Sequence, residues 1–253
     1  MLLGFDFPIG IPAAYAARAG ITDFTAALAR FDERFYAAAE RADEIGLGRP
    51  FYPMRPGGRR RQQLLDGLGL AAWSDLLRRC DHGSATRDAA CALFWTLGGS
   101  QVGKAAIAGW RDLLAPALRD GVDVGLWPFQ GSLEELLTRH GFTVAETYPG
   151  EVYRHLALSP ALRRDGGKRS RAARRAAGAR LLAEARRLEV AADPAARAEI
   201  LDGFGAGADG EDRFDAMVGL LGMLGVVRGH RGSGEPDDPL VRRVEGWILG
   251  QKA

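Results

Sequence analysis

Four acidic residues occupy positions from which their carboxylates could act together on metal ions. Asp6 ends the apolar run that opens the chain, and Glu146 ends another apolar run just before a Pro-Gly turn. Asp212 and Asp215 are three residues apart, so they share one face at the start of the apolar helix expected from Arg213 to Val227. Two divalent cations that promote in-line attack on a phosphodiester need such carboxylates. The pattern therefore indicates metal-dependent phosphodiester hydrolysis.

Each of these acids also has a simpler structural explanation. Aspartate favours positions where its side chain hydrogen-bonds the backbone, so Asp6 can cap the turn that follows it. Asp212 and Asp215 place negative charge at a helix N-terminus, where it suits the helix dipole. Only the metal hypothesis predicts that Asp6 lies within about 10 Å of Asp212 and Asp215. It also predicts that repulsion raises the pKa of at least one of the three carboxyls.

The stretch from Ser159 to Glu189 is strongly basic. Arg164, Lys168, Arg171 and Arg175 recur at helical spacing, so they can form one cationic stripe on a helix. Such a stripe binds phosphates without regard to sequence, because binding releases counterions from the nucleic acid. The alternative is a solvated helix face, since no aromatic residues are interleaved for base stacking.

A glycine-rich segment, Gly98 to Lys104, satisfies the pattern GxxxxGK of a phosphate-binding loop. The next residue is Ala105, so the hydroxyl that normally holds magnesium is absent. A glycine-rich turn before a helix from Ala105 to Leu118 explains the same letters. We expect a structural turn, and keep nucleotide binding through this segment as an alternative.

The elements that would position these residues follow an α/β pattern. Short apolar runs ending in Asp6, around Val124 and from Phe142 to Thr147 predict strands. A helix beginning at Ser132, with a capping box completed by Glu135, separates the second and third runs. Two strands joined by one helix predict a parallel crossover. We expect a single domain over residues 1–253, with a helical and loop insertion around residues 20–95.

Composition narrows the class of protein without assigning a function. The 253 residues, 47% of them hydrophobic and 26% charged, suffice to bury a full core, and the net charge is only +2. Two cysteines are too few for a disulfide framework or a cysteine zinc site. The opening apolar run has no basic flank and is interrupted by Asp6 and prolines, which argues against a signal peptide or membrane anchor. We expect a cytoplasmic protein with no membrane partner.

Several motifs together resemble the DUF429 family of predicted nucleases, whose members are similar to ribonuclease H-like proteins of the RuvC type. The motifs run in order along nearly the whole chain: DxPxG at 6–10, GGSQVGK at 98–104, WPF at 127–129, ETYP at 146–149, DRFDAM at 212–217 and EGWIL at 245–249. The resemblance implies a mixed sheet flanked by helices and a magnesium or manganese site. Asp6, Asp212 and Asp215 would be its ligands, and Glu146 an accessory catalytic residue.

The chain departs from this family at its start. The family opens with a three-stranded meander whose first strand supplies an acid, and this sequence begins at what resembles the fourth strand. The Asp6 strand would then have an unpaired edge, which a homodimer could cover. Three functions follow: a metal-dependent nuclease, active or inactive; a noncatalytic module that binds nucleic acid or protein; and a nucleotide-binding protein that uses Gly98 to Lys104.

Overall fold

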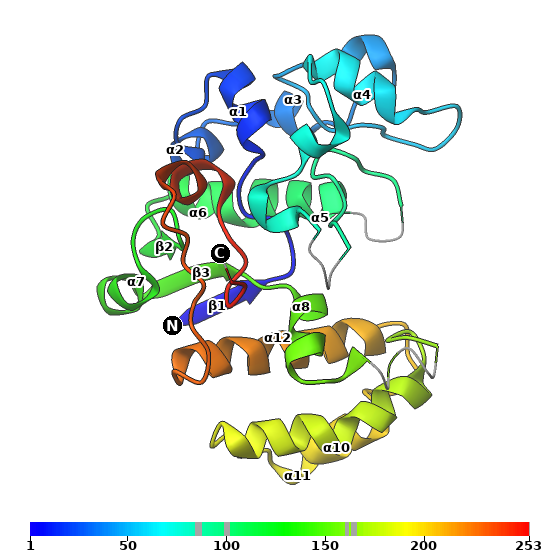
Figure 1. Ribbon diagram of the computed structural model, residues 1–253, viewed down its shortest axis with the longest axis vertical. Coiled ribbons are helices and arrows are strands. Elements are labelled where there is room, and N and C mark those ends of the chain that lie inside the picture. The colour runs from blue at the N-terminus through cyan, green and yellow to red at the C-terminus, as the bar shows by residue number, and fades with distance from the viewer. Residues whose placement is uncertain (84–87, 99–101, 160–161, 163–165, 253) are drawn as a thin grey trace. The chain divides into compact units, whose positions relative to one another are not determined.

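The computed structural model describes residues 1–83, 88–98, 102–159, 162 and 166–252 (Figure 1). They form two compact units. Unit 1 contains Met1–Glu146 and Glu235–Ile248, and unit 2 contains Thr147–Gly234 and Leu249–Lys252. Most of unit 2 is therefore inserted into the sequence of unit 1. The expected partition, a single domain with an insertion around residues 20–95, stays a prediction.

Unit 1 is built on a small parallel sheet with the strand order β1-β3-β2. The strands are β1 (Leu2–Phe5), β2 (Val124–Leu126) and β3 (Phe142–Glu146). In register, Leu3 lies opposite Val144 and Gly125 opposite Thr143. The α/β class and the parallel crossover from β2 to β3 are thus confirmed. The pairings between the described strands are parallel, and β1 lies at one edge of the sheet.

The crossover helix α7 (Leu133–Arg139) has the predicted capping box. The Ser132 hydroxyl accepts from the Glu135 N–H at 3.3 Å, and the Glu135 carboxylate accepts from the Ser132 N–H at 2.9 Å. Leu133 and Leu136 are buried on the inner face of α7. The capping box fixes where α7 begins, and the two buried leucines fix which face of the helix turns to the core.

The remaining helices of unit 1 are short. They are α1 (Ala13–Ala19), α2 (Phe24–Leu28), α3 (Glu33–Tyr36), η1 (Ala42–Glu44), α4 (Arg61–Leu68), η2 (Trp73–Leu76), η3 (Arg79–Asp81), α5 (Val102–Gly109), η4 (Trp110–Leu114), α6 (Ala115–Arg119) and η5 (Val241–Glu245). Gly20 ends α1 in the left-handed conformation, and Asp23 and Asp32 cap the next two helices. These repeated caps explain why the chain after Tyr15 forms several short helices.

The loop after Asp6 is held by η4 and by the C-terminal part of unit 1. The Trp110 indole N–H donates to the Pro8 carbonyl at 2.7 Å, and the Ile11 N–H donates to the Val244 carbonyl at 3.0 Å. A Cβ added at Gly10 would lie 2.0 Å from the Glu245 carbonyl oxygen, so only glycine permits this approach. The predicted turn after Asp6 is therefore a packing site between two distant segments.

Unit 2 is helical in its described part. Its helices are α8 (Pro149–His155), α10 (Arg171–Arg187), α11 (Pro194–Asp202) and α12 (Gly210–Val227). Leu181, Ile200, Phe214 and Val218 pack in its core. Across the described ranges of both units, the helices are too short or too polar to cross a membrane.

Candidate functional site

The predicted acids belong to both units. Asp6 is exposed, directly after the carboxyl end of β1 in unit 1. Asp212 and Asp215 lie in the first turns of α12 in unit 2. Because the hypothesis of convergence joins the two units, it stays a prediction.

Asp212 and Asp215 differ sharply in exposure. Asp212 is exposed, whereas Asp215 is only 8% exposed. The two oxygens of Asp215 are engaged, one by the Tyr153 hydroxyl and the other by the Lys168 ammonium. Lys168 also lies 3.1 Å from Glu211, one turn before Asp215. The cation at Asp215 in this structure is thus a lysine, which also bridges a second carboxylate on α12.

Glu146, the last residue of β3, is 5% exposed and held by protein donors. The Arg78 guanidinium donates to its two oxygens at 2.6 and 2.7 Å, and the Ile9 N–H donates at 2.7 Å. Burial raises the pKa of the Glu146 carboxyl above its ordinary value, and the positive charge of Arg78 opposes this shift. The geometry therefore gives Glu146 a structural task and adds no support for its accessory catalytic role.

Arg78 is the centre of a buried ionic cluster that sequence reasoning missed. Its side chain is fully buried, and it also donates to Asp81 at 2.9 and 3.0 Å and to the carbonyls of Ile9 and Glu245 at 3.2 and 3.4 Å. Burial opposes the charge on Arg78, but Asp81 and Glu146 outweigh it and raise the Arg78 pKa well above its usual range. No signal in the sequence distinguishes Arg78 from its exposed neighbour Arg79.

Glu245 strengthens the same region from the C-terminal segment. Its carboxylate accepts from the N–H groups of Ala13 and Arg79 at 3.0 and 3.1 Å. Glu245 and Arg78 together connect four segments of unit 1: the loop before α1, η3, the end of β3 and η5. The resemblance singled out Glu245 only as part of a motif, and its contacts indicate a role in holding the fold.

Within the described part of the chain, no three acidic, histidine or cysteine side chains gather in a way that could hold a metal ion. The acids seen within each unit therefore do not by themselves fit the expected Mg²⁺ or Mn²⁺ centre. The hypothesis of a metal site rests on Asp6 meeting the acids of α12.

The predicted cationic stripe is only partly a helix face. Arg164 lies outside the described residues. Helix α10 begins at Arg171 with Ser170 as its cap, so Lys168 precedes the helix, and it is paired with Asp215 and Glu211. Arg171 pairs with Asp202. Arg175 remains as an exposed arginine of α10.

The GxxxxGK segment falls partly outside the described residues, at positions 99–101. Helix α5 starts at Val102, Gly103 is buried and Lys104 is exposed. A Cβ at Gly103 would lie 2.8 Å from the Leu93 carbonyl oxygen, which explains this glycine by packing. Of the residues described just before it, 88–98, none lies in a strand of the sheet. The structural turn expected at this segment stays a prediction, and so does the alternative of nucleotide binding.

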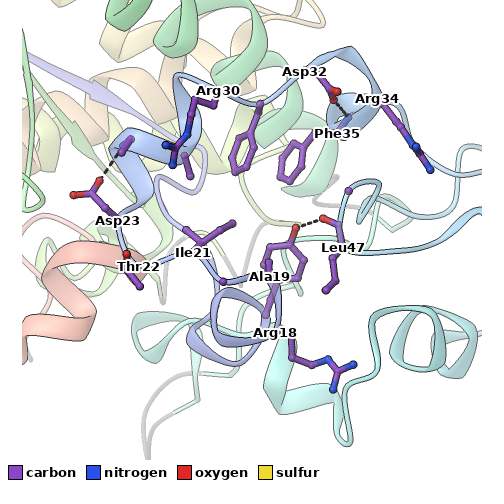
Figure 2. A pocket seen from close by; sticks show the side chains of 16 residues that line it. Arg18, Ala19, Ile21, Thr22, Asp23, Arg30, Asp32, Arg34, Phe35 and Leu47 are labelled. Carbon is purple, nitrogen blue, oxygen red and sulfur yellow. Dashed lines mark hydrogen bonds between the residues drawn. The ribbon is translucent and has the colours of Figure 1, made fainter.

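Unit 1 contains an open pocket of about 650 Å³ that no sequence motif indicated (Figure 2). It lies between α1, α2, α3 and the segment around Leu47. Its walls include the aromatic rings of Tyr15, Phe31 and Phe35, together with three arginines and two aspartates. Aromatic rings and charged side chains thus line the same pocket.

Comparison of the chain with protein-family models, curated proteins and solved structures finds no match.

Proposed function

We propose that the protein binds nucleic acid through the exposed arginines of α10. The observation that carries this proposal is the pair Arg175 and Arg186, which are exposed and make no ion pair within the described residues. Eleven residues are close to three helical turns, so both arginines lie on one face, about 16 Å apart. Cations at such a spacing on one helix face can contact phosphates several nucleotides apart along a nucleic-acid backbone.

The contacts of the acids favour a protein that binds nucleic acid without hydrolysing it. Glu146 is held by Arg78, and Asp215 is held by Lys168 and Tyr153. A divalent ion at either carboxylate would have to displace a cation already in place. The arginines of α10 need no such rearrangement, because Arg175 and Arg186 already face water.

Fluorescence anisotropy with a labelled 20-base-pair duplex tests the proposal over a series of salt concentrations. Affinity should fall as salt rises, and each Arg175→Gln or Arg186→Gln substitution should reduce the log–log salt slope by about 0.9. Arg139→Gln is the matched control, since Arg139 is an exposed arginine at the end of α7 in unit 1. Binding that is insensitive to salt, or equally weakened by Arg139→Gln, contradicts the proposal.

A metal-dependent phosphodiesterase with a ribonuclease H-like fold is the second candidate. It is supported by Asp6, placed at the carboxyl end of a parallel strand where such sheets bind ligands, and by the exposed position of Asp212. A nuclease assay with and without Mn²⁺ tests it. Activity that needs Mn²⁺ and disappears in Asp6→Asn and Asp212→Asn, while the exposed Asp120→Asn control keeps it, would establish hydrolysis.

Two further parts of the proposal concern location and assembly. A cytoplasmic protein is proposed, in keeping with the nucleic-acid partner. Homodimer formation through β1 is supported by the edge position of this strand in the sheet. Light scattering of the purified chain measures it directly: a dimer has twice the 27.2 kDa mass of one chain, and a mass of one chain at all concentrations refutes it.

A further inference from the structure

The pocket of unit 1 has an excess of positive charge that the protein does not neutralise. Arg18, Arg30 and Arg34 line it, and none of them makes an ion pair with another residue that the structure describes. Figure 2 shows Arg30 and Arg34 on opposite sides of the Phe35 ring. Arg18 lies lower, where its guanidinium packs against Gly69.

The two aspartates of the lining are committed elsewhere. Asp23 accepts from the Thr25 hydroxyl at 2.8 Å and the Ala26 N–H at 2.9 Å, and Asp32 accepts from the Phe35 N–H at 2.9 Å. Both therefore serve as helix caps, and neither makes an ion pair with an arginine that the structure describes. Three arginines and two aspartates leave one net positive charge in the lining, and the exposed side chains of Arg30 and Arg34 are available to an anion.

An aromatic surface lies beside these arginines. The rings of Phe31 and Phe35 stack with centroids 3.6 Å apart and planes 4° from parallel. Phe35 is 4% exposed, whereas Phe31 is half-buried and still meets solvent. The sequence RFDERF, residues 30–35, repeats the Arg-Phe pair four residues apart, so each ring of the stack has an arginine directly before it.

We infer that this pocket binds a nucleotide, with the heterocyclic ring against the stacked phenylalanines and the phosphate at Arg30. A volume of about 650 Å³ accommodates one nucleotide. Aromatic rings accept any base by stacking, and arginine pairs with phosphate through two parallel hydrogen bonds. A nucleotide of this kind is either a free mononucleotide or the terminal nucleotide of a single strand. The inference rests on unit 1 alone and does not depend on the arginines of α10.

Isothermal titration calorimetry with AMP, adenosine and inorganic phosphate tests the site. AMP should bind with a Kd of about 1 mM or tighter, and adenosine and phosphate each about tenfold more weakly, because each carries only half of the recognised chemistry. Arg30→Gln and Phe31→Ala should each weaken AMP binding about tenfold. Arg139→Gln, which removes the same charge from unit 1 outside the pocket, should leave it unchanged.

A 5′-phosphorylated single-stranded hexanucleotide separates the two sources. Equal or weaker binding than AMP identifies a free nucleotide, and binding at least tenfold tighter than AMP, still lost in Arg30→Gln, identifies a strand end. Arg175→Gln should leave the affinity for AMP unchanged. This result would distinguish the pocket from the arginines of α10. The inference would be overturned if AMP bound no more tightly than phosphate. It would also be overturned if the pocket variants kept the circular dichroism of the unmodified chain and bound AMP and the hexanucleotide as tightly as that chain does.

Discussion

Replacing Arg78 by methionine should destabilise unit 1 far more than any change to a surface charge. The substitution keeps a long apolar stem but removes the guanidinium that bonds to Asp81 and Glu146. Both carboxylates are 5% exposed and would be left without a buried cation. Removing one partner of a buried ion pair costs about 3–5 kcal/mol, a large part of the 5–15 kcal/mol of a typical unfolding free energy.

The chain provides its own optical probe for this measurement. All five tryptophans, at positions 73, 95, 110, 127 and 247, belong to unit 1. Urea unfolding followed by tryptophan fluorescence therefore reports on unit 1, while circular dichroism also senses the helices of unit 2. We expect Arg78→Met to lower the free energy of unfolding measured by fluorescence by about 3–5 kcal/mol.

The adjacent Arg79 supplies the matched control. Its side chain is 54% exposed and lies 2.8 Å from Asp238, so Arg79→Met should cost less than about 1 kcal/mol. Adding Asp81→Asn and Glu146→Gln to Arg78→Met should restore part of the loss, because no uncompensated charge remains buried. A loss for Arg78→Met below about 1 kcal/mol, or equal to that for Arg79→Met, would refute this account of the cluster.

Two further predictions concern glycines and pH. In α12, a Cβ at Gly225 meets open space, so Gly225→Ala should stabilise unit 2 by about 0.5–1 kcal/mol in denaturation followed by circular dichroism. Gly178→Ala should instead destabilise unit 2, because its Cβ would lie 2.7 Å from the Ile200 carbonyl. Equal effects of the two substitutions would refute the packing argument. The Gly141 N–H, with His140, lowers the pKa of Asp123, so the stability that Asp123 contributes is present above its unfolded pKa, about 3.9, and is lost as pH falls through the lower folded pKa. Asp123→Asn should thus lower the free energy of unfolding at pH 7, and lower it less at pH 3. An equal loss at both pH values, measured by fluorescence, would contradict this pH dependence.

Local patterns predicted local structure well in this protein. The capping box at Ser132 depends on residues three positions apart, and the crossover from β2 to β3 on one helix between consecutive strands. The Arg78 cluster could not be predicted, since the partners of Arg78 lie up to 167 residues away from it in the sequence. Its charged members, Arg78, Asp81 and Glu146, also resemble ordinary surface charges in the sequence. Likewise, the residues that line the pocket of unit 1 match no known motif in their spacing, and only folding brings Arg18 of α1 and Arg34 of α3 to the same pocket.

The insertion of unit 2 also determines the order in which the protein can fold during synthesis. Glu245, which closes the region around Arg78, follows Glu146 by 99 residues. At about 5–20 residues per second, the ribosome needs about 5–20 s to add them. During that interval α8, α10, α11 and α12 are complete, whereas the wall that η5 forms against Gly10 and Ala13 is missing. We expect nascent unit 1 to expose, in this window, the apolar surface against which Val244 of η5 packs in the finished core.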